Sequence, residues 1–375
     1  MNRLQRVMAA VERKALDRFP TDIWCVEEIK EKLYRYCGTR EWVGVLDGLD
    51  IDGIIGLAPP YVGPRLPDLG ENLRQNEWGM VDRCQEYAAG VYWEQVGYPL
   101  AQAETIADLD AYPWPNPDWY DYSSLPDLCA QYPGRAIEIG YTAIFYYHNK
   151  LRGLELSMVD LALRPEFSRH LIRRIADTFL GYHERCYAAA GKAMHITQVT
   201  DDFGSQTGLL IGKGMINEYY RPWMQRAMNQ AKRYGIKVFH HDDGAIYALI
   251  PDLLEMGIDV LNPVQWRCRG MDREAIGRNF GQAVCFHGAV DNQYTLPFGS
   301  PEEVRQEVAH NLRTLGQTGT GYIIAPCHNI QAITPLDNIL AMYQAPRTLE
   351  VLDSDPRLGY HAANDGRGAT QVRAS

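Results

Sequence analysis

The chain has 375 residues, of which 46% are hydrophobic and 22% are charged, with a formal net charge of −10. This composition is typical of a globular protein with a large core, and the acidic balance argues against nucleic acids and anionic membranes as main partners. No apolar run is long enough to span a bilayer, and residues 1–20 lack the apolar stretch of a signal peptide. The eight cysteines form no CxxC pair, which favours a reducing compartment, so we expect a cytoplasmic protein.

The first 125 residues predict an elaboration that packs on a larger unit. Helical patterns are expected over residues 2–18 and 26–36, and an apolar strand over residues 51–57. The stretch 58–82 is rich in Gly, Pro, Asn and Asp and predicts irregular structure, whereas alternating Tyr, Val and Trp residues over 85–100 suit a hairpin. The tryptophans of this region are interpreted as packing surface: Trp78, Trp93, Trp114 and Trp119.

From residue 135 the chain alternates short apolar strands with amphipathic helices. Strands are expected at 136–139, 195–200, 236–240, 260–261, 283–286 and 322–325. Helices are expected near 157–190, 215–233, 246–255, 271–279, 301–315 and 335–351. Such βα alternation predicts a parallel sheet, and six or more units in series favour a closed barrel. We therefore expect an α/β fold, a (β/α)8 TIM barrel with an N-terminal extension, in one domain over residues 1–350 with a tail at 351–375.

Polar side chains follow nearly every strand of this region. In such barrels the chemistry lies at the C-terminal ends of the strands, because the βα loops open on one face. The carboxylic acids Asp202, Glu138 and Asp291 are therefore the catalytic candidates, although Asp201 or Asp202 can instead cap a helix, and Asp291 can cap a turn. The substrate-binding candidates are Tyr141, Gln265, His287, His328 and Arg152, the last of which can also be a solvated helix charge.

The stretch VFHHDDGA at residues 238–245 is the sharpest local signal. His241 and Asp243 are two residues apart, so an extended chain points both side chains to the same side. Cys327 from the last strand is a candidate third ligand across the barrel mouth, and three protein ligands with an open position are typical of a catalytic zinc. A metal-free interpretation stays open, in which His241 and Asp243 hydrogen-bond a substrate and Cys327 is a small buried residue.

The chain also carries an ordered series of motifs. They are DRFP at 17–20, RGLELSMVDLALRPEF at 152–167, TDDFGSQTG at 200–208, HxDG at 241–244, GIDVLNPVQ at 257–265, FHGAVDNQ at 286–293 and APCHNIQAITPLDNILAMYQA at 325–345. In this order they resemble the uroporphyrinogen decarboxylase-like superfamily, and the resemblance implies a (β/α)8 barrel. True decarboxylases bind uroporphyrinogen with an N-terminal segment rich in arginine and glycine, which residues 20–45 lack. The resemblance is therefore closer to the methyltransferase members.

The methyltransferase members exchange methyl groups between a corrinoid protein and a thiol, or demethylate small methylated compounds. Several hold zinc through a His-x-Cys pair and a late Cys. His241, Asp243 and Cys327 match these positions, with Asp in place of the first Cys, which implies a more Lewis-acidic zinc suited to an ether or alcohol oxygen. In this scheme Asp202 or Glu138 donates a proton, and a corrinoid on a partner protein takes the methyl group.

The leading hypothesis is therefore an enzyme that moves a methyl group from a small methylated compound, for example a methoxy compound, to a corrinoid protein with zinc assistance. The alternative is a metal-free decarboxylase or lyase that holds a small or tetrapyrrole carboxylate with Arg152 or Arg221. A third class is a non-catalytic binding protein on a barrel scaffold. Whether the chain forms a homodimer is left open.

Overall fold

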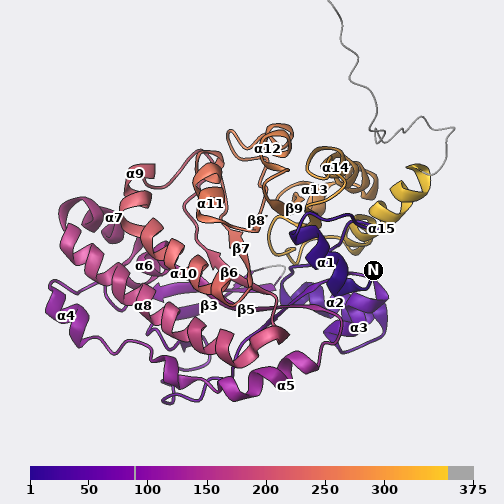
Figure 1. The fold of residues 1–375 in the computed structure, drawn as a ribbon. Helices are drawn as coiled ribbons and strands as arrows, with labels where there is room; N and C mark the ends of the chain where they lie inside the picture. The colour runs from indigo at the N-terminus through magenta and orange to yellow at the C-terminus, as the bar shows by residue number, and fades with distance from the viewer. Residues whose placement is uncertain (88–89, 354–375) are drawn as a thin grey trace, which may run out of the picture.

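A computed structural model describes residues 1–87 and 90–353, with side chains described to residue 346 (Figure 1). Its centre is a parallel sheet of seven strands in the order β1-β5-β6-β7-β8-β9-β10. The strands are β1 (Ile54–Leu57), β5 (Ala136–Ala143), β6 (Ile196–Thr200), β7 (Lys237–His241), β8 (Val260–Asn262), β9 (Cys285–Val290) and β10 (Tyr322–Pro326). Each strand predicted from residue 135 onward is present, so the parallel α/β arrangement is confirmed.

The two edges of the sheet are joined by an extended segment, residues 20–26. The Asp22 amide donates to the Ile324 carbonyl of β10 at 2.9 Å, and the Gly53 amide, just before β1, donates to the Thr21 carbonyl at 3.0 Å. The sheet therefore curls until its edge strands share one bridging segment. Because the described residues contain seven regular parallel strands in this sheet and no eighth, the predicted (β/α)8 barrel is confirmed only as a curled parallel sheet.

One end of the curled sheet is filled by α1 (Arg3–Val11). Val7, Ala10 and Val11 of this helix form a buried cluster with one residue from each of six strands: Ala136, Ile196, Phe239, Val260, Cys285 and Ile323. Most of these residues stand at or near the start of their strands, so α1 covers the N-terminal end of the sheet. The C-terminal strand ends, where the polar residues were predicted to gather, are left for the site.

Helices cover the outside of the sheet (Figure 1). The predicted helix over 157–190 is divided into two at Arg164, because Pro165 can begin a helix but cannot continue one. The others follow the predicted order with shifted bounds. The helices are α6 (Ile144–Arg152), α7 (Leu154–Leu163), α8 (Pro165–Ala190), α9 (Lys213–Met215), α10 (Arg221–Arg233), α11 (Ile250–Met256), α12 (Arg273–Phe280), α13 (Thr295–Phe298), α14 (Pro301–Thr314) and α15 (Leu336–Asp353).

The N-terminal elaboration is more regular than predicted. The expected hairpin is present but begins earlier, and it belongs to a three-stranded antiparallel sheet of β2 (Leu73–Gln75), β3 (Val81–Tyr87) and β4 (Gly90–Gly97). The first predicted helix is shorter than 2–18. The remaining helices of this region are α2 (Glu27–Cys37), α3 (Trp42–Gly48), α4 (Ile106–Ala111) and α5 (Leu125–Ala130).

At the other end of the chain, α15 includes residues 351–353 of the predicted tail, and the rest of that tail, residues 354–375, lies outside the described residues. Within the described ranges, no helix combines the length and the apolar character needed to cross a membrane. This agrees with the absence of a long apolar run noted in the sequence.

Candidate active site

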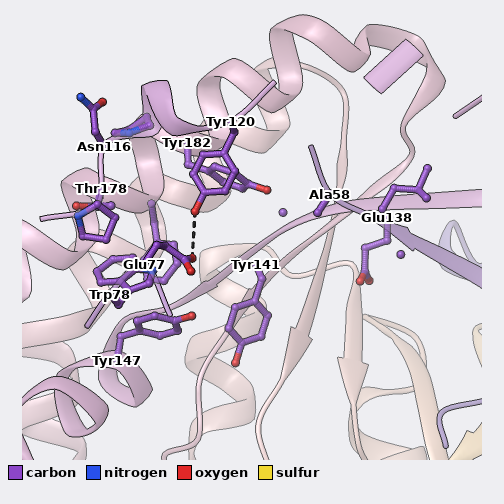
Figure 2. Close-up of a pocket in the computed structure, with 16 residues that line it drawn as sticks. Ala58, Glu77, Trp78, Asn116, Tyr120, Glu138, Tyr141, Tyr147, Thr178 and Tyr182 are labelled. Atoms are coloured by element: carbon purple, nitrogen blue, oxygen red, sulfur yellow. Dashed lines mark hydrogen bonds between the residues drawn. The ribbon is translucent and has the colours of Figure 1, made fainter. Parts of the chain in front are cut away.

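Two cavities that share Tyr141 lie at the C-terminal ends of the strands. The smaller, of about 380 Å³, is lined by Trp24, Tyr141, Tyr146, Gln198, Asp202, His241, His328 and Asn329. The larger, of about 440 Å³, lies against the N-terminal elaboration and is shown in Figure 2. Of the predicted site residues, the structure brings Tyr141, Asp202, His241 and His328 together at the smaller cavity, while Glu138 lines the larger one.

A group of side chains that could hold a metal ion lies beside the smaller cavity, which two of its members, His241 and His328, line. His241, Asp243 and His328 each offer one ligand atom, and these atoms lie within 4.8 Å of one another. The Nε2 atom of His241 is 3.8 Å from a carboxylate oxygen of Asp243 and 3.8 Å from one of Asp202. Two imidazoles and a carboxylate with room for a further ligand are a common donor set for catalytic zinc.

A buried hydrogen-bond relay orients the His241 ring. The Nδ1 atom of His241 lies 2.5 Å from the Asn262 side-chain oxygen, so the ring donates there and keeps the Nε2 lone pair free. The Asn262 amide donates in turn to Nδ1 of His287 at 2.7 Å, and Nε2 of His287 donates to Asp22 at 3.0 Å. Asn262, His287 and Asp22 are fully or almost fully buried. Relays of this kind fix the tautomer of a metal-binding histidine, so His241 fits a zinc ligand.

Cys327 and His328 are neighbours just after β10 but have different surroundings. The Cys327 thiol is buried and donates to the Val264 carbonyl with a separation of 3.7 Å, and burial raises its pKa well above the ordinary value. Its neighbour His328 lines the cavity instead, and its Nδ1 atom accepts the Asn329 amide at 2.8 Å. Among the described residues, the group of side chains that could hold a metal ion therefore includes His328 and not the predicted Cys327.

Asp201–Asp202 and Asp242–Asp243 are two pairs in which the first aspartate holds backbone amides and the second lies near His241. Asp201 is buried and accepts the amides of Phe145 and Tyr146 at the start of α6, a different helix from the one near residue 217 that the sequence suggested. Asp242 is likewise buried and accepts the amides of the loop after β6. The second member of each pair, Asp202 or Asp243, is more exposed and faces His241. Burial raises the pKa of Asp202, and His241 opposes that effect.

Glu138 is the acid of the larger cavity, and a bulge in β5 positions it. The register of β5 shifts between Glu138 and Tyr141, where Gly140 has a φ of 95° and packs against Thr197 and His183 with no room for a Cβ atom. The extra residue lets Glu138 and Tyr141, three positions apart, both face the cavities. Burial raises the pKa of Glu138 to about 8, although a hydrogen bond of 2.8 Å from Gln198 lowers it.

The structure places the other predicted residues outside both cavities. Asp291 accepts three backbone amides of the following turn and forms an ion pair of 2.6 Å with Arg267, which is the capping role that the sequence left open. Arg152 is buried rather than solvated and pairs with Asp160 at 2.8 Å. Gln265 accepts the Gly244 amide at 2.7 Å and so holds the loop after β7. His287 belongs to the relay behind His241.

Several lining residues were missed from the sequence. Gln198 had a detectable signal, because it is a large polar residue in the middle of a buried strand whose other polar residues are threonines, and it pairs with Tyr141 of the neighbouring strand. Trp78 was interpreted as packing surface, but its ring lines the larger cavity. The other missed residues come from loops or helices, where no periodicity marks them: Trp24, Tyr146, Asn329, Glu77, Tyr120, Tyr147 and Tyr182.

Where His241 holds a zinc ion, replacing Asn262 with leucine is expected to weaken zinc binding by about 10- to 100-fold, because the relay that orients His241 is broken. The change also leaves polar atoms of His241 and His287 without partners, at a cost of about 2 kcal/mol in the free energy of unfolding. Zinc affinity is measured by competition with a chelator. The control is Asn338→Leu, which removes a buried asparagine that holds α15 to the backbone of α13 and its C-cap. Equal losses of zinc affinity in both variants would contradict the relay.

Comparisons with known proteins assign the family. A model of the uroporphyrinogen decarboxylase (URO-D) family matches residues 142–349, which is more than half of the chain, and the chain belongs to that family. Among solved structures, a methyltransferase from Methanosarcina mazei has a TM-score of 0.62 at 14% identity, over 93% of this chain and 99% of the other. At this identity the likeness shows the fold. The resemblance noted in the sequence is thereby confirmed.

A second solved structure is a B12-independent methionine synthase from Shewanella sp. W3-18-1 in complex with selenomethionine. It has a TM-score of 0.41 at 14% identity, over 62% of this chain and 67% of the other. No curated protein matches the chain.

Proposed function

We propose that the protein is an enzyme that transfers a methyl group from a small methylated compound to a corrinoid carried by a partner protein, with zinc assistance. The observation that carries the proposal is the group of His241, Asp243 and His328 at the C-terminal ends of the strands, beside two cavities that can hold the methyl donor. The family and the fold are compatible with an enzyme of this kind, although a fold alone does not define the reaction.

The proposed ligands are nitrogen and oxygen atoms without a thiolate. A donor set of this kind leaves the ion more Lewis-acidic than a cysteine-rich set, which favours a donor whose methyl group is attached to oxygen. When bound, the zinc lowers the cost of negative charge that develops on the oxygen as the methyl group leaves. The Nδ1 atom of His328 accepts the Asn329 amide, so in the neutral ring the proton is on Nε2. To bind the metal through a free lone pair, Nδ1 must therefore give up its hydrogen bond with Asn329.

The transfer must balance in electrons and protons. The methyl group leaves the donor as a cation equivalent to the reduced corrinoid, and the electron pair of the carbon–oxygen bond stays on the oxygen. That oxygen then needs one proton. Glu138, whose pKa is raised to about 8 by burial, holds a proton at neutral pH and lines the larger cavity. We assign it as the proton donor, with Gln198 fixing its carboxyl group and Asp202 as the carboxylate nearest His241.

A carboxylate substrate fits the cavities less well. Arg152 and Arg221, the residues proposed to hold one, are already paired with Asp160 and with Asp252 and Glu255. The residues that line the two cavities include no lysine or arginine. A decarboxylase would need a cation to bind the acid group, so we do not advance that alternative.

The proposal is tested with the purified protein, zinc and reduced cobalamin as methyl acceptor. Methoxy compounds are offered singly, and formation of methylcobalamin is followed by its absorbance. We expect one zinc ion per chain and transfer from at least one methoxy compound that stops when a chelator removes the metal. Transfer that survives complete removal of zinc would refute the role of the metal. A chain that binds no zinc and transfers no methyl group to the acceptor would refute the proposed function.

A further inference from the structure

The larger cavity has walls made mainly of aromatic rings. We call it the aromatic chamber and define it by six rings and two acids that line it: Trp78, Tyr120, Tyr141, Tyr147, Phe179, Tyr182, Glu77 and Glu138. Figure 2 shows the Glu77 carboxylate below Tyr120, near Trp78 and Tyr147, with Tyr141 between this group and Glu138. The acids therefore lie on two sides of a space bounded by rings.

The rings support one another. Trp78 packs against Tyr147 with ring centroids 4.8 Å apart and against Phe179 at 5.2 Å, and Tyr147 and Phe179 meet edge to face at 4.8 Å. On the other wall, Tyr120 meets Tyr182 at 4.9 Å. Edge-to-face packing of this kind holds rings in fixed orientations, so the chamber is formed before a ligand arrives.

Glu77 is an acid without a cationic partner. Its carboxylate accepts a hydrogen bond of 3.0 Å from the Tyr120 hydroxyl, and within the described part of the chain no lysine, arginine or histidine forms an ion pair with it. The side chain is only partly exposed. Withdrawing a carboxylate from water beside aromatic rings is unfavourable unless a positive charge compensates it. The chamber lacks such a charge among its lining residues.

We propose that the aromatic chamber binds an organic cation, an N-alkylated ammonium group, as the recognition end of the substrate. Ring faces attract cations, and alkyl carbons on the nitrogen bury well against them, while Glu77 supplies the opposite charge. An anion is disfavoured because no basic residue lines the chamber. A metal ion is disfavoured because the described side chains that group around a metal position include neither Glu77 nor Glu138.

Tyr141 links this chamber to the candidate metal group, since it lines both cavities. A substrate with its ammonium group at the Glu77 end of the aromatic chamber would extend past Tyr141, with its other end toward Glu138 and His241. The methyl donor is then a molecule with a cationic end and a methylated oxygen at the other. This assignment of the cation to the methyl donor rests on the proposed function, whereas binding of an organic cation in the chamber does not.

The test is calorimetric titration of the purified full chain with choline and with 3,3-dimethylbutan-1-ol, in which a neutral tert-butyl group replaces the trimethylammonium group. We expect choline to bind at least about tenfold more tightly, the difference that a charge and ring faces supply in a partly desolvated site. Glu77→Gln should remove most of that preference and leave the neutral compound unaffected. Glu155→Gln, which removes an exposed glutamate of α7 that does not line the chamber, is the matched control.

Tyr141→Leu is a second variant at a ring that is 40% exposed, so the fold should tolerate it. It should weaken choline binding about three- to tenfold. Equal affinities for the two compounds, or an unchanged preference in a folded Glu77→Gln protein, would overturn the cation assignment. Choline binding in a protein that transfers no methyl group from any methoxy compound would refute the proposed function alone. Methyl transfer from a methoxy compound without tighter binding of choline would refute this inference alone.

Discussion

Under the proposed function, replacing His241 with alanine is expected to remove the zinc ion and nearly all methyl transfer. The ring is the ligand whose orientation the relay through Asn262 and His287 fixes, so its loss should weaken zinc binding by more than about 100-fold. Activity should fall by about 100- to 1000-fold, because metal stabilisation of developing charge contributes several kcal/mol. Zinc content by elemental analysis and methylcobalamin formation are the two measurements.

The control for this variant is His170→Ala, which removes a histidine that pairs with Asp110 on the surface of α8. It should change neither zinc content nor activity. Thermal unfolding of both variants shows whether the fold is retained. A His241→Ala protein that keeps one zinc ion and full activity would mean that the metal, if one is needed, is held elsewhere.

Replacing Glu138 with glutamine should change how stability depends on pH. Burial raises the pKa of Glu138 in the folded protein to about 8, against 4.5 as the ordinary value of a glutamate. The folded state therefore holds this proton more tightly than the unfolded state, and wild-type stability contributed by Glu138 is lost as the pH rises from 4.5 through 8. A shift of this size corresponds to about 5 kcal/mol.

Glutamine keeps the side-chain oxygen that accepts from Gln198 but has no proton to lose. Relative to the wild type, the variant should therefore gain stability as the pH rises across this window and should differ little in slope below it. Urea unfolding at pH 5, 7 and 9 measures the difference, with Glu155→Gln again as the control. Parallel stability curves for the wild type and Glu138→Gln would show that the carboxyl group ionises normally in the folded protein.

The fold was predictable because the signal is local and repeated. Apolar runs bounded by turn residues marked β5 to β10, and the rule that parallel strands end at one face placed Tyr141, Asp202 and His328 near His241 but did not separate them from Asp291 and Gln265, which lie outside the cavities. The prediction of the third metal ligand depends on which way a single side chain points. Cys327 and His328 are neighbours just beyond β10, and only the three-dimensional course of the chain decides that the histidine faces the cavity.

The aromatic chamber could not have been predicted in the same way. Its rings come from the stretch before β3, from the proline-rich loop before α5, from β5, from α6 and from α8. No periodic pattern joins segments that lie so far apart in the sequence, so Trp78 resembled a residue that merely packs. Glu138 was found for a local reason, its place on a strand, but its partner Gln198 on the next strand was not considered. Contacts between elements, rather than element types, were the missing information.

Under the proposed function, helix α1 limits the order in which molecules can reach the site. Its apolar face fills the N-terminal end of the sheet, and Arg6 anchors it through ion pairs of 2.5 Å with Asp52 and 2.7 Å with Asp17. A methyl donor and a corrinoid protein must then share the opposite mouth. The large partner would cover the entrance that the small donor uses, so the donor has to arrive first and the demethylated product has to wait until the partner departs. Turnover would then follow a compulsory order, and dissociation of the partner protein would limit its rate.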